Sequence, residues 1–240
     1  MNRLFDIHMH ILPCVDDGAQ DMEMSLDMLR EAVREGIGTI VATGHSYAYA
    51  FDPHNPLRQY DALCRAARAA DLPVRLLLGM EMYCNPEIVE QCIDRLKAGE
   101  FLTLNGTALV LTEFEANLTT VQEAAFCIEK ILAAGYVPVV AHVERYPFAD
   151  VPSVTRLREM GALFQINAYS IAEDRSAYLR DTVNELLRAQ CVDFIGSDAH
   201  RSSGYRPPRV RKGLEHLYRN FEESYVNRIV FENATQWLLP

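Results

Sequence analysis

The hydrophobic positions of the chain alternate between short, continuous apolar runs and longer stretches with helical spacing. The short runs are rich in β-branched residues, as in IGTIVAT at residues 37–43, which is typical of strands buried on both faces. The longer stretches, such as residues 23–35, carry an apolar stripe and often end at a glycine. Strands are predicted at residues 4–8, 37–43, 73–81, 108–115, 137–141, 162–167 and 192–200. Helices are predicted at residues 23–35, 57–70, 86–98, 120–134, 153–160, 175–189, 208–220 and 222–232.

This alternation predicts an α/β fold with a parallel sheet, because strands that are separated by helices run in the same direction. Seven strands in 240 residues are also consistent with closure of the sheet into a barrel. Residues 1–240 are expected to form a single domain, since a chain of this length can bury one large core and no segment indicates a second domain.

The charge of the chain argues against a nucleic-acid partner. Its formal net charge is −10, from 23 Lys plus Arg and 33 Asp plus Glu. A surface that binds nucleic acid or an anionic membrane is usually basic. No apolar run is long enough for membrane insertion, and the first residues do not follow a signal-peptide pattern. The expected location is therefore the cytoplasm.

Several common hydrolytic motifs are missing from the sequence. None of the six cysteines has an arginine six positions later, so the phosphate loop of cysteine phosphatases is missing, and no C-x-x-C pair is present. Walker A and G-x-S-x-G motifs are also lacking. The cysteines are interpreted as free thiols in a reducing compartment. They are Cys14, Cys64, Cys84, Cys92, Cys127 and Cys191.

Histidine and carboxylate residues follow the predicted strand ends. An isolated H-x-H, as at His8 and His10, would more often be a solvated strand end than a metal site. Here, however, similar residues occur at other strand ends, which meet at one rim of a barrel. Two carboxylates about 4 Å apart repel by about 4 kcal/mol near a protein surface, so the set predicts bound cations. The candidate metal ligands are His8, His10, Asp17, His45, Glu81, Glu113, His142, Asp198 and His200.

The ordered series of motifs resembles a known family. The motifs are DIHMHILP with DDG, ATGHS, GME, LTEF, AHVERY and GSDAHR with RPP, and together they extend over most of the chain. The chain is similar to the PHP superfamily of metal-dependent phosphoesterases. Within that superfamily it resembles the manganese-dependent protein-tyrosine phosphatases of bacterial capsule and exopolysaccharide operons. The resemblance implies a distorted (β/α)7 barrel of the PHP type with three divalent metal ions.

The resemblance also implies roles for individual residues. Arg145 and Arg206 match arginines that bind phosphate, and Asp6 would orient a ligating imidazole. The ions would be Mn²⁺, with Fe²⁺ and Zn²⁺ as alternatives for a nitrogen and oxygen ligand set. The implied metal sites are His8, His10, Glu81 and Asp198; Glu81, Glu113 and His142; and Asp17, His45 and His200.

The implied reaction is hydrolysis of phosphotyrosine on a tyrosine-phosphorylated protein, namely an exopolysaccharide tyrosine kinase. The expected mechanism is attack of a metal-bound hydroxide on phosphorus while the two arginines neutralise the phosphoryl oxygens. The alternatives are hydrolysis of a small phosphate monoester such as histidinol phosphate, a non-catalytic kinase-docking module, and a nucleic-acid phosphoesterase. The acidic charge argues against the last of these.

A few positions depart from the family pattern. Gly44 and Ser46 flank His45 where the family usually has proline and histidine, and Cys14 stands where glycine is usual. The spacing between His200 and Arg206 is also slightly long. These departures concern substrate contacts and the phosphate-binding residues, not the metal ligands. Residues 46–56 are predicted to form an aromatic loop that either contacts a phosphotyrosine ring or packs into the core.

Overall fold

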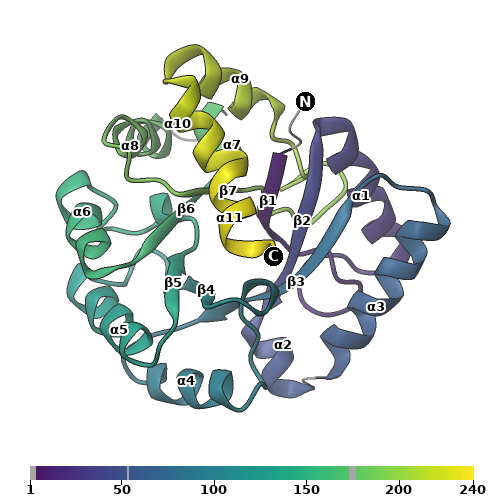
Figure 1. The fold of residues 1–240 in the computed structure, drawn as a ribbon, viewed down its shortest axis with the longest axis horizontal. Coiled ribbons are helices and arrows are strands. Elements are labelled where there is room, and N and C mark those ends of the chain that lie inside the picture. The colour runs from purple at the N-terminus through teal and green to yellow at the C-terminus, as the bar shows by residue number, and fades with distance from the viewer. Residues whose placement is uncertain (1–3, 53, 173–176) are drawn as a thin grey trace.

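The computed structural model of the protein describes residues 4–52, 54–172 and 177–240. Its seven strands pair in chain order, and every pairing is parallel. The last strand returns to the first, where the Asp198 amide donates to the His8 carbonyl at 2.8 Å and the His10 amide donates to the Ala199 carbonyl at 3.0 Å. The sheet is therefore a nearly closed barrel with helices around its outside (Figure 1), which confirms the predicted fold class.

The observed elements agree with most of the predicted ones. The strands are β1 Leu4–Met9, β2 Ile37–His45, β3 Arg75–Tyr83, β4 Leu109–Glu113, β5 Val137–Val140, β6 Leu163–Asn167 and β7 Phe194–Gly196. The longer helices are α1 Met22–Glu35, α3 His54–Ala69, α4 Val89–Lys97, α5 Val121–Ala133, α6 Val151–Met160, α8 Ala177–Arg188 and α9 Arg211–Asn220. The shorter ones are α2 Ser46–Phe51, α7 Ala168–Ala172, α10 Glu223–Asn227 and α11 Asn233–Leu238. Single turns are η1 Leu104–Gly106, η2 Val143–Arg145 and the π-helical η3 Arg228–Glu232.

Local signals in the sequence explain where several helices begin and end. The Asp21 carboxylate accepts from the Met24 amide at the start of α1, and Gly36 ends that helix with a φ of 95°. Thr120 and Glu123 form the predicted capping box of α5. Sequence and structure agree at these ends because a cap involves only residues a few positions apart.

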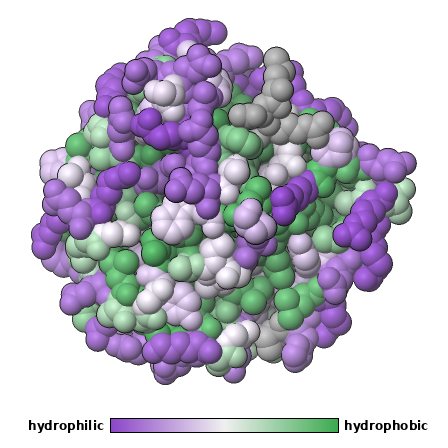
Figure 2. Space-filling model, in the orientation of Figure 1, coloured by the Kyte–Doolittle hydropathy of each residue, from purple (hydrophilic) through white to green (hydrophobic). Residues whose placement is uncertain are grey.

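The last helix closes one end of the barrel. Ala234 and Leu238 of α11 pack against Phe5, Leu109 and Phe194, which lie near the amino ends of their strands. In Figure 1 this helix lies across the middle of the molecule. Figure 2 shows the same face, with hydrophilic side chains gathered around its margin and more apolar ones over the middle. The carboxyl ends of the strands therefore remain for the functional site.

The structure corrects three of the predicted elements. Residues 46–56 were predicted as a loop, but they form helix α2 and the first turn of α3 around the undescribed residue 53. Helix α9 begins at Arg211 and not at Pro208, because the Glu35 carboxylate accepts from the amides of Val210 at 3.0 Å and Arg211 at 2.9 Å. The predicted helix 222–232 continues through a π-helical turn to Leu238. The first two residues of predicted helix 175–189 lie outside the described ranges.

Across the described residues, every helix is too short or too polar to cross a lipid bilayer.

Candidate metal centre

The first strand brings two imidazoles to the centre of the site. His8 lies in β1 and His10 follows its last residue, and both side chains are buried. Their Nε2 atoms are 3.1 Å apart. Two imidazoles this close are stabilised by a charged group between or beside them. The Glu81 carboxylate lies next to both. The alternation of polar residues in this strand therefore places both rings at one point.

Glu81, near the carboxyl end of β3, is the carboxylate at the centre of this cluster. Burial alone would raise its pKa, but the surrounding imidazoles, with His8 foremost, outweigh burial and hold the pKa well below its usual range. Glu81 is therefore an ionised carboxylate without exposure to water. Its oxygens lie 3.2 Å from His8 Nε2, 3.2 Å from His10 Nε2, 3.1 Å from His45 Nδ1 and 2.9 Å from His142 Nε2.

Asp198 is a second buried carboxylate beside the two first-strand imidazoles. Its Oδ1 is 3.5 Å from the Nε2 atoms of His8 and His10. Its Oδ2 accepts from Arg145 Nη2 at 2.7 Å and from Asn167 Nδ2 at 3.1 Å. Burial alone would raise its pKa, but the facing cations keep the pKa far below its usual range. Asp198 also has a φ of 51°, a backbone conformation that costs energy in a non-glycine residue and is often found at functional sites.

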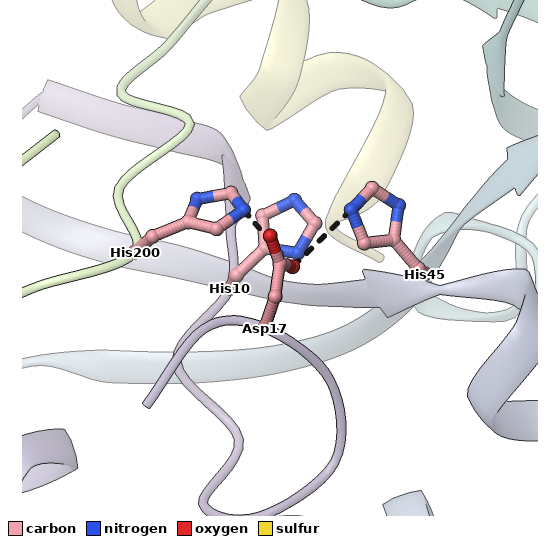
Figure 3. A group of neighbouring side chains, drawn as sticks. All are labelled: His10, Asp17, His45 and His200. Atoms are coloured by element: carbon pink, nitrogen blue, oxygen red, sulfur yellow. Dashed lines mark ion pairs between the residues drawn. The ribbon is translucent and has the colours of Figure 1, made fainter. Parts of the chain in front are cut away.

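A third group lies at the outer edge of the cluster (Figure 3). Asp17 Oδ1 is 3.4 Å from His45 Nε2 and 3.3 Å from His200 Nε2, and the His10 ring lies between these two imidazoles. The Asp17 side chain is 61% exposed, whereas His10 is fully buried. The polar contacts with His200 and His45 hold the pKa of Asp17 far below its usual range. This group is therefore the part of the cluster that faces solvent.

The structure brings all nine predicted metal ligands together. Among the described residues, each of four groups offers ligand atoms that lie within 4.8 Å of one another. The groups are His10, Asp17, His45 and His200; His8, His10 and Asp198; His8, Glu81 and His142; and His45, Glu81 and Glu113. Compared with the expected sites, the outer group adds His10, and the group that contains Asp198 lacks Glu81. Glu113 and His142 fall into separate groups around Glu81, although their side chains are only 3.5 Å apart.

The chemistry of the cluster fits divalent cations. In the described part of the chain, Asp198 Oδ1 and His200 Nε2 are buried and lack a hydrogen bond, and they have only ion-pair contacts, with Arg206 and Asp17 among others. Burial alone would lower the pKa of His10, but the Asp16 carboxylate outweighs burial and raises the pKa to about 9. In the absence of metal, protonated imidazole supplies the positive charge that balances the carboxylates of the cluster. A bound metal ion can supply this positive charge instead. Its donors are nitrogen and oxygen without thiolate, which suits Mn²⁺, Fe²⁺ or Zn²⁺.

Two residues outside the predicted set orient the imidazoles. Asp16 Oδ2 lies 2.8 Å from His10 Nδ1 and accepts from the His45 amide at 2.9 Å. Gln165 Oε1 lies 3.1 Å from His8 Nδ1 and accepts from the His142 amide. Asp16 could have been found from the adjacent DDG motif, but no local signal marks Gln165.

The prediction that Asp6 orients a ligating imidazole was wrong. Its Oδ1 accepts from the backbone amides of His8 at 3.1 Å and Ser197 at 2.9 Å, so it joins β1 to the loop after β7 and contacts no imidazole nitrogen. Burial raises the pKa of Asp6 to about 6, against the effect of these hydrogen bonds. The alternation of residues along the strand could not distinguish a ring contact from a backbone contact.

The two arginines expected to bind phosphate meet at the same carboxylate. Arg145 lies in the turn η2 after β5, and Arg206 lies in the loop after β7. Arg206 Nη2 forms an ion pair with Asp198, and Arg206 Nε donates to the Asp198 carbonyl at 3.1 Å. The long spacing between His200 and Arg206 is accommodated by a closed loop, in which the His200 amide donates to the Arg206 carbonyl at 2.9 Å.

The unusual residues around the site also have structural roles. Cys14 has a φ of 56°, which explains why glycine suits this position, and its thiol donates to the Gln20 carbonyl at 2.8 Å. Ser46 Oγ accepts from the Tyr83 amide at 3.0 Å. Within the aromatic segment, Tyr49 is buried with its hydroxyl on the Gly79 carbonyl, whereas Phe51 is 94% exposed. This segment is therefore partly core and partly surface.

Replacing Asp16 by asparagine is expected to weaken Mn²⁺ affinity by about tenfold to hundredfold, because removing a carboxylate that orients a ligand typically has this effect. An amide can no longer accept from the His10 ring and two backbone amides with full negative charge. Competition with a fluorescent chelator measures the affinity. The matched control is Asp27→Asn, an exposed carboxylate paired with Arg30 on α1. Equal affinities of Asp16→Asn and the wild type would contradict this role.

Comparison with known proteins gives relatives that span nearly the whole chain. Residues 4–239 match the family model described as capsular polysaccharide synthesis, CpsB/CapC. Tyrosine-protein phosphatase CpsB of Streptococcus agalactiae is 29% identical over 240 residues, which cover 96% of each chain. Tyrosine-protein phosphatase YwqE of Bacillus subtilis is 35% identical over 201 residues, which cover 82% of this chain and 77% of the relative.

A solved structure is also similar to this chain. It comes from a study of YwqE from Bacillus subtilis and CpsB from Streptococcus pneumoniae, which are described as unique metal-dependent tyrosine phosphatases. The TM-score is 0.88 at 33% sequence identity, and the match covers 98% of this chain and 94% of the other. The similarity thus includes the strand ends and the loops that carry the cluster.

Proposed function

Because the chain belongs to the CpsB/CapC family of capsular polysaccharide synthesis, we propose that it is a metal-dependent protein-tyrosine phosphatase, and thus a phosphomonoester hydrolase. The observation that carries this proposal is the position of the two arginines. Arg145 and Arg206 both form ion pairs with Asp198, so two guanidinium groups lie directly beside a cluster suited to divalent cations. A tetrahedral anion such as a phosphoryl group can bind between these guanidinium groups and bound cations.

The nine ligand residues are proposed to hold three divalent ions, Mn²⁺ in the first place. When bound, the ions would supply positive charge to the phosphoryl oxygens and lower the pKa of coordinated water. The inner ions would use the groups around Glu81 and Asp198, and the outer ion would use the group that contains Asp17. Four overlapping groups around shared residues within the described part of the chain support more than one ion.

Other residues of the chain orient the metal ligands and bind the phosphoryl group. Asp16 contacts the ring of His10 and the backbone amide of His45. Gln165 contacts the ring of His8 and the backbone amide of His142, so these two residues hold the imidazoles in place. Arg145 and Arg206 bind the phosphoryl oxygens and neutralise the charge that spreads over them during transfer. The phenolate of tyrosine has a pKa of about 10, so it leaves with less help from a proton donor than an alkoxide requires.

The proposed substrate is phosphotyrosine on a tyrosine kinase of exopolysaccharide or capsule synthesis. The family description places relatives in capsular polysaccharide synthesis, and the names of curated relatives specify tyrosine phosphatases. All six cysteines are free, which is typical of proteins in a reducing compartment and supports a cytoplasmic location. We also propose that residues 1–240 act as one domain, since one sheet extends from β1 to β7.

Metal removal and reconstitution test the proposed function. Protein treated with chelator is expected to release no phosphate from a phosphotyrosine peptide, and Mn²⁺ is expected to restore hydrolysis more fully than Fe²⁺ or Zn²⁺. Released phosphate is measured in parallel from a phosphoserine peptide and from histidinol phosphate. Metal-loaded protein that leaves phosphotyrosine intact would contradict the proposal. In that case hydrolysis of histidinol phosphate would indicate a small-molecule phosphatase, and kinase binding without any hydrolysis would indicate a docking module.

A further inference from the structure

A cavity of about 420 Å³ lies beside the metal-ligand cluster. One side is formed by α2 and the other by α4 with the segment that follows it. This volume is at the small end of the range for ligand pockets, so it suits one side chain better than a folded surface. The lining residues that matter here are His45, Tyr47, Ala50, Ile88, Phe101 and Glu113.

The cavity and the cluster share two residues. His45 and Glu113 line the cavity, and both belong to the candidate metal groups around Glu81. His45 Nδ1 is 3.5 Å from Glu113 Oε2. A phosphoryl group bound at the cluster therefore has the cavity as its direct neighbour on this side. The group attached to a phosphoryl oxygen can therefore lie in this cavity.

The walls of the cavity suit an aromatic ring. Tyr47 stacks on His45, with ring centroids 5.4 Å apart and an angle of 25° between the planes, although the tyrosine is 57% exposed. Ile88 and Phe101 give apolar surface farther in, and Arg95 covers the Phe101 ring at 5.3 Å from its centroid. Aromatic rings bind favourably between apolar and stacked aromatic surfaces. An exposed tyrosine at the entrance is therefore available for contact with a substrate.

We propose that this cavity binds the phenyl ring of the phosphotyrosine substrate and that Tyr47 is a residue that determines specificity for it. The proposal rests on the proposed function and deepens it. With the phosphoryl group at the metal cluster, the ring lies along Tyr47 and enters between α2 and α4. Phosphoserine has no ring to fill this space, so its phosphate binds without the apolar contribution. The cavity thereby selects aryl phosphates over alkyl phosphates by binding.

Filling the cavity tests this proposal. Ala50→Phe adds a ring at an exposed position of α2 that lines the cavity, without changing a metal ligand. The matched control is Ala69→Phe, at an exposed position of α3 that is not among the residues lining this cavity. Calorimetry with the Mn²⁺-loaded proteins measures the affinity of phosphonomethylphenylalanine, a non-hydrolysable analogue of phosphotyrosine. Inorganic phosphate serves as the probe that has no ring.

Ala50→Phe is expected to weaken binding of the analogue by about tenfold or more, the typical contribution of burying an aromatic side chain. Its affinity for inorganic phosphate is expected to stay within about twofold of the wild type, and Ala69→Phe is expected to change neither affinity. Unchanged affinity for the analogue would overturn the proposal. Equal weakening for both probes would also overturn it, because the substitution would then act through the metal cluster.

A second substitution examines Tyr47 directly. Tyr47→Ala is expected to raise KM for a phosphotyrosine peptide by about tenfold with a smaller change in kcat, and Tyr47→Phe is expected to retain the wild-type KM. Loss of binding with the peptide but not with the free analogue would overturn the proposal, since the cavity would then hold a neighbouring residue. A wild-type protein that fails to hydrolyse phosphotyrosine contradicts the proposed function. Wild-type hydrolysis with unchanged variants contradicts only the role of the cavity.

Discussion

Replacing Asp198 by asparagine is expected to lower kcat/KM for a phosphotyrosine peptide by about a thousandfold or more and to reduce the bound metal content. Asp198 is fully buried, and its oxygens lie beside His8, His10, Arg145 and Arg206. An amide of the same shape carries no charge, so it leaves two arginines facing the inner imidazoles without their shared anion. Elemental analysis gives the metal content, and phosphate release gives the rate.

The neighbouring Asp193 offers a matched control. It is also buried, but it lies before β7, near the opposite end of that strand, and binds Arg158 at 2.7 and 2.9 Å. Asp193→Asn is expected to lower the free energy of unfolding by about 1 to 3 kcal/mol, because the buried pair loses a charge. The folded variant is expected to keep the wild-type metal content and kcat. Full activity and full metal content in Asp198→Asn would refute its assignment as a ligand.

The sequence was sufficient to predict all seven strands to within a few residues, and with them which side chains gather at the rim. A parallel barrel places all its carboxyl strand ends at one rim, so residues far apart in the chain converge without any local signal for contact. His45 and Glu113, for example, are the last residues of β2 and β4, and they meet at 3.5 Å. Identifying the strands was therefore enough to predict that these side chains are neighbours.

The residues that sequence reasoning missed act through tertiary contacts. Gln165 reaches His8 from β6, and Glu35 caps helix α9 from the end of α1. Neither contact involves residues close in sequence, and neither has a characteristic motif. Asp6 was placed on the correct strand, but its role depends on which atom its carboxylate faces. Periodicity gives the face of a strand and not the orientation of a side chain on it.

Arg145 tests whether phosphate binding and metal binding are separate tasks at this site. Arg145→Lys is expected to lower kcat by about a thousandfold, which corresponds to about 4 kcal/mol, within the range found for arginines that stabilise phosphoryl transfer. Lysine keeps the positive charge beside Asp198, but it loses the planar fork that can hold two phosphoryl oxygens. The metal content is expected to remain that of the wild type, since the charge near the ligands is unchanged.

The control for this substitution is Arg156→Lys, an exposed arginine on α6, for which wild-type kcat and metal content are expected. A wild-type kcat in Arg145→Lys would show that charge alone suffices at this position and that the fork has no role. Loss of metal in the same variant would show that Arg145 acts by holding Asp198 in place through its 2.7 Å contact. The three results differ because Asp198 connects the arginines to the metal ligands, so only a charge-conserving substitution can separate their effects.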